Sequence, residues 1–263
     1  MSIQKIYQVD AFTDKVFGGN PAAVCPLPSW PDDAVLQNIG MENNLAETAF
    51  YVQQEDCYEI RWFTPTVEVD LCGHATLAAA YVLFFLGEHE ENIINFYSPR
   101  SGKLTVTKNV ETLTLNFPAD EFTEVSMTDE LTAGFSIRPQ HTFKGKTDYM
   151  LVFKNEDEIR DVIPAFDKIA NVDGRGIIVT ARGKDVDFVS RFFAPQSGVN
   201  EDPVTGSAHT TLIPYWAKRL GKSALTAMQL SPRKGYLECT FLGERVEISG
   251  KGKLYMSGEI YLT

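Results

Sequence analysis

Hydrophobic and polar residues follow a pattern along the chain that predicts strands around a buried helix. Residues 5–12 alternate between apolar and polar side chains, which is typical of a strand with one buried face. Residues 75–86 are largely apolar, with Gly73 before them and Gly87 after them, and glycines suit both ends of a helix. This run of about 12 residues is shorter than the ~20 that a membrane span needs, so it predicts a core helix.

The same pattern occurs twice in the chain. Residues 61–87 read RWFTPTVEVDLCGHATLAAAYVLFFLG, and residues 191–221 read RFFAPQSGVNEDPVTGSAHTTLIPYWAKRLG. The glycines at the two helix entrances, Gly73 and Gly206, are 133 positions apart, and the later motifs SPRSGKL and SPRKGYL have the same offset. A common offset at separated landmarks predicts that both halves share one fold.

This duplication determines how we divide the chain, because a length of 263 residues allows one or two domains. We expect a first domain over residues 1–118 and a second over residues 119–263. The polar residues 119–141 are the predicted linker, and the last strand could pair back with the first domain.

Each repeated helix begins at a glycine, and a helix entrance suits an anionic ligand. The first turn of a helix has unpaired N–H groups and a partial positive charge, and a glycine there lets a ligand approach closely. If the two copies face each other, both entrances converge on one cleft for a small anion. The alternative is that both are buried core helices with glycine caps.

Glu47 is the candidate acid or base. It is the single charged residue in positions 43–54, at the start of a predicted strand. Desolvation there would raise the pKa of its carboxyl toward the range useful for proton transfer. At an offset of 130 its counterpart in the second copy is Ile177, so the strand pattern does not itself require an acid. The alternative is a glutamate at a strand edge that faces solvent.

Other polar residues gather at the two helix entrances. Cys72 and His74 flank the first glycine, where His74 could position a substrate, relay a proton or cap the helix. In the second copy, Asp202 precedes a proline, and Ser207 would lie in the first helical turn. Asn20 belongs to the loop GGNP, whose amides can line a site or form an ordinary tight turn.

Metal binding is not predicted. Cys72, His74, His209 and Asp202 are of ligand type but lack ligand spacing, and His209 favours a core or capping role. The four cysteines contain no CxxC pair, which argues against a disulfide framework and fits the reduced cytoplasm. A formal net charge of -11 disfavours nucleic acid as a partner. The N-terminus lacks the pattern of a signal peptide.

Four ordered motifs resemble the PhzF, or phenazine-biosynthesis-like, family of the diaminopimelate epimerase superfold. They are GGNPAAV at residues 18–24, NLAET at 44–48, CGHAT at 72–76 and EDPVTGSAH at 201–209. The resemblance covers essentially the whole chain. It implies an α/β (α+β) fold of two pseudo-symmetric domains, each a curved mixed sheet or barrel around a central helix. It also implies an active site between the domains and a homodimer.

The resemblance also assigns roles to residues. It implies that Glu47 is the general acid and base that isomerises a small cyclic carboxylate bearing an amino or hydroxy group. It implies no metal and no organic cofactor. The substrate-binding residues predicted in this way are His74, Asp202, Gly73, Gly206, Ser207 and Asn20.

One departure from the wider superfold narrows the chemistry. Racemases and epimerases of that superfold use a cysteine at each helix entrance, whereas this chain has Cys72 at the first and Thr205 at the second. A hydroxyl is too weak an acid to replace a thiol, whose free pKa is about 8.5. The sequence therefore predicts that one carboxylate moves a proton between two carbons. The alternatives are a Cys72-dependent hydrolase or lyase, and a non-catalytic protein that binds a small anion.

Overall fold

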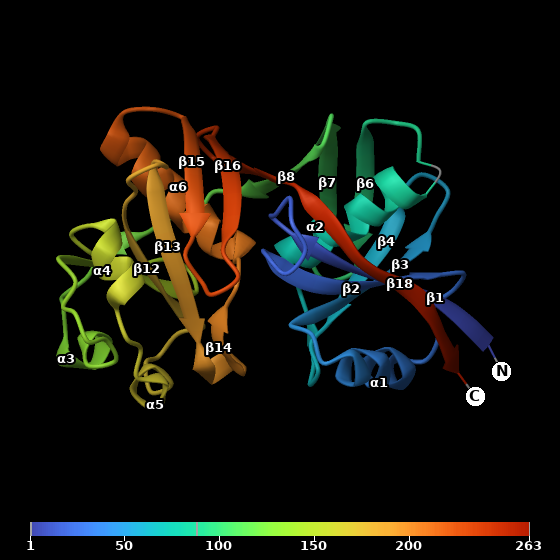
Figure 1. Cartoon of the computed structure of the whole chain (residues 1–263), viewed down its shortest axis with the longest axis horizontal. Coiled ribbons are helices and arrows are strands. Elements are labelled where there is room, and N and C mark those ends of the chain that lie inside the picture. Colours follow the sequence, from blue (N-terminus) through green and yellow to red (C-terminus); the bar gives the residue numbers. More distant parts are fainter. Residues whose placement is uncertain (1, 88, 263) are drawn as a thin grey trace. The chain divides into compact units, whose positions relative to one another are not determined.

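The computed structural model describes residues 2–87 and 89–262 (Figure 1). The chain divides into two compact units. One extends to Asn116 and also includes the chain from Ser249 onward, and the other extends from Phe117 to Ile248. Within the described ranges, no helix combines the length and the apolar character needed to cross a bilayer.

The first unit is a mixed sheet with one helix enclosed by it. Its strands pair in the order β18, β1, β2, β3, β4, β6, β7 and β8, and the short β5 pairs with β4. The β2–β3 and β4–β6 pairs are parallel, and the others are antiparallel. The bounds are β1 (Ser2–Ala11), β2 (Asn20–Leu27), β3 (Glu47–Gln53), β4 (Tyr58–Phe63), β5 (Glu68–Val69), β6 (Ile93–Ser98), β7 (Gly102–Asn109), β8 (Thr112–Pro118) and β18 (Gly252–Leu262).

Helix α2 (Gly73–Tyr81) is the central element of the first unit. It packs on β1, β2, β3 and β18 (Figure 1), and every residue from His74 to Ala80 is buried. Its alanines let the surrounding strands approach the helix from several sides. The helix continues as the π-helix η1 (Val82–Leu86) and ends at Gly87, as the glycine pattern predicted. Helix α1 (Asp33–Asn43) packs outside the sheet, where Leu36 and Ile39 join a separate apolar cluster.

The second unit repeats this plan. Its strands pair in the order β9, β10, β11, β12, β13, β15 and β16, and β14 pairs with β13. The parallel pairs are β11–β12 and β13–β15, which match β2–β3 and β4–β6. The central helix is α6 (Gly206–Leu220). The other bounds are β9 (Thr123–Glu124), α3 (Asp129–Thr132), β10 (His141–Lys144), β11 (Asp148–Val152), α4 (Glu156–Asp161), α5 (Phe166–Ile169), β12 (Gly176–Arg182), β13 (Phe188–Ala194), η2 (Pro195–Ser197), β14 (Val199–Asp202), β15 (Ala224–Gln229), β16 (Gly235–Phe241) and β17 (Arg245–Gly250).

Each unit contains an arginine–glutamate ion pair, and the two ion pairs have the same geometry. Arg61 donates two hydrogen bonds to Glu68, at 2.7 and 2.9 Å, and Arg191 donates two to Glu201, at 2.8 and 3.0 Å. Each guanidinium also lies over the phenylalanine two residues later in its own strand, at 5.1 and 4.9 Å from the ring centre. The shared fold predicted from the repeat is therefore present in detail.

The unit boundaries lie somewhat differently from the predicted domain ends at residues 118 and 119. The first unit includes β18, which pairs with β1 along ten residues from Ser2 to Ala11. Residues 119–141, predicted as a linker, lie inside the second unit and contain β9 and α3. A polar composition does not distinguish a linker from short surface elements, because both face solvent.

We predict that replacing Arg191 with methionine destabilises the protein by about 3 to 5 kcal/mol, because it leaves a largely buried carboxylate unpaired. The Arg191 and Glu201 side chains are 11% and 14% exposed. The side chain of Arg191 also donates to the carbonyl oxygens of Ile159 and Val162, at 3.3 and 2.8 Å. Urea unfolding measures the change.

The matched control is Lys251→Met. Lys251 pairs with Glu111, their side chains are 43% and 71% exposed, and an exposed ion pair contributes only about 0 to 1 kcal/mol. Equal losses of stability in the two variants would contradict the structural role given to Arg191.

Candidate active site

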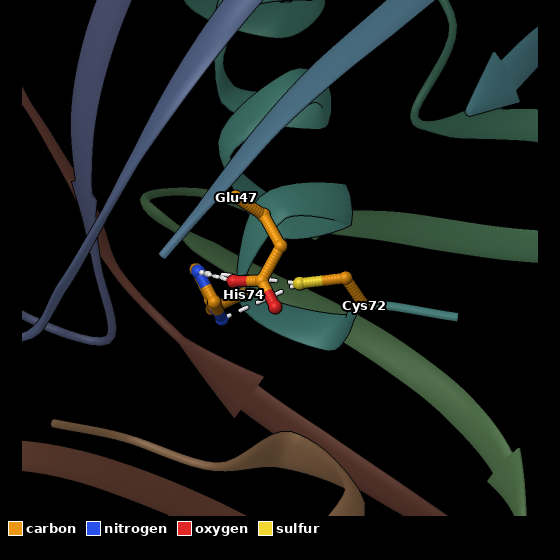
Figure 2. A group of neighbouring side chains, drawn as sticks. All are labelled: Glu47, Cys72 and His74. Atoms are coloured by element: carbon orange, nitrogen blue, oxygen red, sulfur yellow. Dashed lines mark hydrogen bonds and ion pairs between the residues drawn. The ribbon is translucent and has the colours of Figure 1, made fainter. Parts of the chain in front are cut away.

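The first residues of three elements meet at one end of the first unit. β2 begins at Asn20 and β3 begins at Glu47, and the parallel register that pairs Ala22 with Glu47 brings these two strand starts together. Helix α2 has Cys72 as its N-cap residue and His74 in its first turn. Figure 2 shows Glu47, Cys72 and His74 converging at this helix entrance.

His74 is at the centre of the group. Its Nε2 lies 3.1 Å from Oε2 of Glu47, and its Nδ1 lies 3.1 Å from the side-chain amide of Asn20. The sulfur of Cys72 lies 3.5 Å from Nδ1 and 3.9 Å from Nε2. The imidazole is buried, so these three neighbours set both its orientation and its charge.

The electrostatic surroundings favour a charged imidazole. Burial lowers the pKa of His74, but the negative charge that Cys72 and Glu47 can carry, together with their hydrogen bonds, raises it well above the usual value. Burial also raises the pKa of the Cys72 thiol to about 11, so Cys72 keeps its proton at neutral pH. The carboxylate of Glu47 is therefore the group that stabilises the imidazolium at neutral pH. The atom of Asn20 that lies 3.1 Å from Nδ1 is the amide nitrogen. An imidazolium donates from both nitrogens, so a charged His74 requires this amide to be turned over, with its oxygen facing Nδ1.

Glu47 is only partly enclosed. Its Oε2, the atom nearest His74, is buried, whereas the side chain as a whole is 19% exposed. The exposed surface of Glu47 therefore belongs to atoms other than Oε2, which contacts the imidazole. A carboxylate that an imidazolium holds, on a side chain that is still partly exposed, can exchange a proton with a ligand.

The second unit has no acid at the equivalent position. Strand β3 begins at Glu47, three residues before the partner of Arg61 in the sheet. Strand β12 begins at Gly176, three residues before the partner of Arg191, so Glu47 and Gly176 occupy equivalent positions. The prediction that Ile177 is the counterpart was wrong by one residue. The connection from β12 to β13 is one residue longer than that from β3 to β4. The offset of 130 was measured between Arg61 and Arg191, which follow this connection, so it is one residue too large for the strands before it.

Close packing keeps a side chain out of the Gly176 position. A Cβ atom there would lie 2.4 Å from the ring of Phe192 and 2.9 Å from the carbonyl oxygen of Phe193. Such contacts require the neighbours to move. The two units therefore share a backbone plan but differ in chemistry.

The predicted residues of the second unit gather at the start of α6. The hydroxyl of Thr205 donates to the carboxylate of Asp202, and Gly206 and Ser207 form the first turn of the helix. Among the described residues, the hydroxyl of Ser207 has no hydrogen-bond partner. The structure thus brings Asp202, Gly206 and Ser207 together in this unit, as it brings Asn20, Glu47, Gly73 and His74 together in the first.

His209 has the structural role that we predicted. It is fully buried, and its Nδ1 donates to the carbonyl oxygen of Thr205 at 2.8 Å. Burial lowers the pKa of His209 to about 4, so its imidazole is neutral at physiological pH. The equivalent residue of α2, Thr76, likewise donates to the carbonyl oxygen of Cys72, at 2.6 Å.

Sequence reasoning missed Gln229. This fully buried residue at the end of β15 donates to the carbonyl oxygen of Asp202 at 2.7 Å, and its Oε1 accepts from the backbone of Thr205 at 2.9 Å. It therefore holds the loop that leads into α6. The signal was a glutamine two residues before the repeated motif that begins SPR.

Comparison with known proteins places these motifs in a wider context. The family model described as "Phenazine biosynthesis-like protein" matches residues 9–258. A Pseudomonas aeruginosa protein named as an uncharacterized isomerase is 51% identical over 257 residues, which is 98% of each chain. A protein of Halalkalibacterium halodurans with the same kind of name is 43% identical over 266 residues, the full length of both chains. The names of these relatives support an isomerase-like enzyme.

Solved structures agree with the fold. A crystal structure from Enterococcus faecalis, described as a phenazine biosynthesis protein of the PhzF family, has a TM-score of 0.97 at 47% identity. It covers 99% of this chain and 100% of its own. A probable proline racemase from Agrobacterium radiobacter has a TM-score of 0.66 at 9% identity, and covers 99% of this chain and 93% of its own. The second likeness concerns the fold alone.

We predict that His74 remains protonated at neutral pH and that Glu47→Gln lowers its pKa, because burial then opposes the charge without a carboxylate to balance it. Nitrogen-15 NMR of the four imidazoles measures this, with His209 as the buried neutral comparison. A neutral His74 at pH 7 in the unaltered protein would contradict the assignment.

The same shift makes stability depend on pH. Folding raises the pKa of His74, so the stabilisation that follows from it is fully present below the unfolded-state pKa of about 6.5 and is lost as pH rises through the folded-state pKa. In Glu47→Gln this loss at high pH is expected to disappear from the unfolding curves.

Proposed function

The chain belongs to the phenazine biosynthesis-like (PhzC-PhzF) family, and on this premise we propose that it is a cofactor-independent isomerase that moves a proton on a small carboxylate-bearing metabolite through Glu47. The observation that carries the proposal is the contact of 3.1 Å between Glu47 and His74 at the entrance of α2.

The proton transfer follows from how the two side chains are held. The imidazolium of His74 fixes Oε2 of Glu47, while another part of the carboxylate side chain is exposed to an incoming ligand. Glu47 removes a proton from one carbon of the substrate and returns it to another carbon on the same face, which moves a double bond. His74 positions the carboxylate and stabilises its negative charge before the proton arrives.

The start of α2 supplies a place for the substrate carboxylate. Backbone N–H groups in the first turn, from Gly73 onward, and the positive end of the helix dipole favour an anion there. An anchored carboxylate would place the adjacent carbon near Glu47. Negative charge that develops on the substrate during proton removal would be stabilised by the same donors. The roles predicted for Asp202, Gly206 and Ser207 remain predictions.

Racemisation by two thiols is not supported by the chemistry of the side chains. The position equivalent to Cys72 holds Thr205, whose hydroxyl is hydrogen-bonded to Asp202. Cys72 itself is a buried thiol with a raised pKa, so little thiolate is present at neutral pH. A single carboxylate on one face suits a proton shift within one substrate instead.

We predict that Glu47→Gln reduces turnover by at least about 100-fold, since an amide cannot accept and return a proton and general acid–base catalysis contributes about 10² to 10⁴. The assay uses a panel of unsaturated cyclic carboxylates that bear amino or hydroxy groups, incubated in heavy water. Proton NMR then detects deuterium in the product.

The matched control is Glu55→Gln, because Glu55 is an exposed glutamate outside the helix entrance. Thermal unfolding verifies that both variants are folded. Full activity in folded Glu47→Gln would refute the role of Glu47.

A Cys72-dependent hydrolase or lyase is the second candidate, favoured by the distance of 3.5 Å between the sulfur and His74 Nδ1. The raised pKa of the thiol opposes it. We predict that Cys72→Ala retains far more turnover than Glu47→Gln in the same assay. A loss as large as that of Glu47→Gln would favour the thiol mechanism over the isomerase.

A further inference from the structure

Three side chains of the first unit lie close enough to share one metal ion. Ligand atoms of Glu47, Cys72 and His74 are all within 4.8 Å of one another, and Figure 2 shows the three groups pointing toward a common centre. His74 Nε2 is 3.1 Å from Glu47 Oε2 and 3.9 Å from Cys72 Sγ. In a tetrahedral zinc site, with bonds of about 2.0 to 2.3 Å, neighbouring ligand atoms are about 3.3 to 3.7 Å apart. The sulfur now lies nearer to Nδ1, at 3.5 Å, so a rotation that moves it toward Nε2 would reach this geometry.

We propose that Glu47, Cys72 and His74 form a binding site for Zn²⁺, and that zinc inhibits the enzyme by occupying its proton-transfer group. The inhibition rests on the proposed function, whereas the binding does not.

The donor set is selective for the kind of ion. A thiolate, an imidazole and a carboxylate are ligands that zinc accepts together, whereas magnesium, calcium and manganese prefer oxygen donors alone. Three protein ligands leave the fourth tetrahedral position to water. A site of this kind binds an exchangeable ion, in contrast to a structural site closed by four protein ligands.

Neighbouring groups already orient two of the ligands. The amide of Asn20 contacts His74 Nδ1, the ring nitrogen that would face away from an ion bound at Nε2. In metal sites the second nitrogen of a histidine ligand usually has such a polar partner. The carbonyl oxygen of Cys72 accepts hydrogen bonds from both the backbone and the hydroxyl of Thr76, at 3.1 and 2.6 Å, which holds Cys72 in place.

Zinc binds deprotonated ligands, so its entry releases the proton of the Cys72 thiol and the proton on His74 Nε2 to solvent. The ion can arrive from the side of Glu47, the most exposed of the three side chains.

Zinc and substrate would compete for the same carboxylate. Coordination uses a lone pair of Glu47, and it removes the imidazolium that positions Glu47. The carboxylate can then no longer take a proton from the substrate. Removal of zinc by a chelator restores the group without any covalent change.

The experiment measures zinc binding by the reduced full chain in competition with a chromogenic chelator. We expect one Zn²⁺ per chain. Loss of an outer-shell partner alone costs about 10- to 100-fold in affinity, so loss of a ligand in Cys72→Ser should weaken binding by at least about 100-fold. Glu47→Gln should also weaken it.

Matched controls separate the site from other thiols and histidines. Cys57→Ser removes the cysteine that is not fully buried, and His141→Ala removes an exposed histidine outside the helix entrance. Both should bind zinc as the unaltered protein does. Absence of zinc binding by the unaltered protein, or unchanged affinity in Cys72→Ser and Glu47→Gln, would overturn the proposal.

A second measurement keeps the test independent of activity and of the stability of any variant. Cobalt(II) added to the unaltered protein should give the charge-transfer absorption of a thiolate ligand together with the visible bands of tetrahedral cobalt. Cobalt bound without a thiolate band would overturn the assignment of Cys72.

Solvent deuterium exchange by the active enzyme tests the inhibition. Zinc at one equivalent should suppress it, and a chelator should restore it. Exchange that continues at full zinc occupancy would overturn the inhibitory role. Zinc binding by a protein that exchanges no deuterium with any substrate of the panel would count against the proposed isomerase, and leave the zinc site supported.

Discussion

The enclosure of an alanine-rich helix by a mixed sheet is the constraint on which the first unit depends. Because α2 packs on β1, β2, β3 and β18, its position along the sheet is fixed, and so is the position of its first turn. The starts of β2 and β3 lie at the same end, through their parallel register. Residues more than fifty positions apart, such as Asn20 and His74, therefore come within hydrogen-bond distance as a consequence of packing the core.

The two units share one fold because of the duplication, and the residues that differ between them determine the chemistry of the site. Matching arginine–glutamate pairs, matching parallel strand pairs and matching helix-start hydrogen bonds show that the two units share a plan. Glu47 has its counterpart in a glycine whose surroundings exclude a side chain, and Cys72 has its counterpart in a threonine bound to an aspartate. A symmetric scaffold can thus present one acid–base group and not two.

One small group of side chains carries both proposed properties. A carboxylate next to an imidazolium is suited to proton transfer, and the same two groups beside a thiol are suited to a borderline metal ion. Burial keeps the thiol protonated and so limits its reactivity at neutral pH. A proton and a metal ion compete for the same lone pairs. Zinc could therefore inhibit catalysis at the active site itself, and a separate regulatory site is not needed.

The sequence by itself determined the duplication, the buried helices with glycine at each end, and the choice of Glu47 as a lone charge in an apolar strand. It also determined the family, because four ordered motifs are specific in combination. It misplaced the counterpart of Glu47, because one offset applied to the whole repeat does not account for a loop that is one residue longer in the second unit. It also missed Gln229. Only the tertiary structure decided that Glu47, Cys72 and His74 lie in contact, that these neighbours raise the pKa of the imidazole and that burial raises the pKa of the thiol. Local patterns set where elements begin and end, whereas charge states and ligand distances depend on burial and on contacts between segments far apart in the chain.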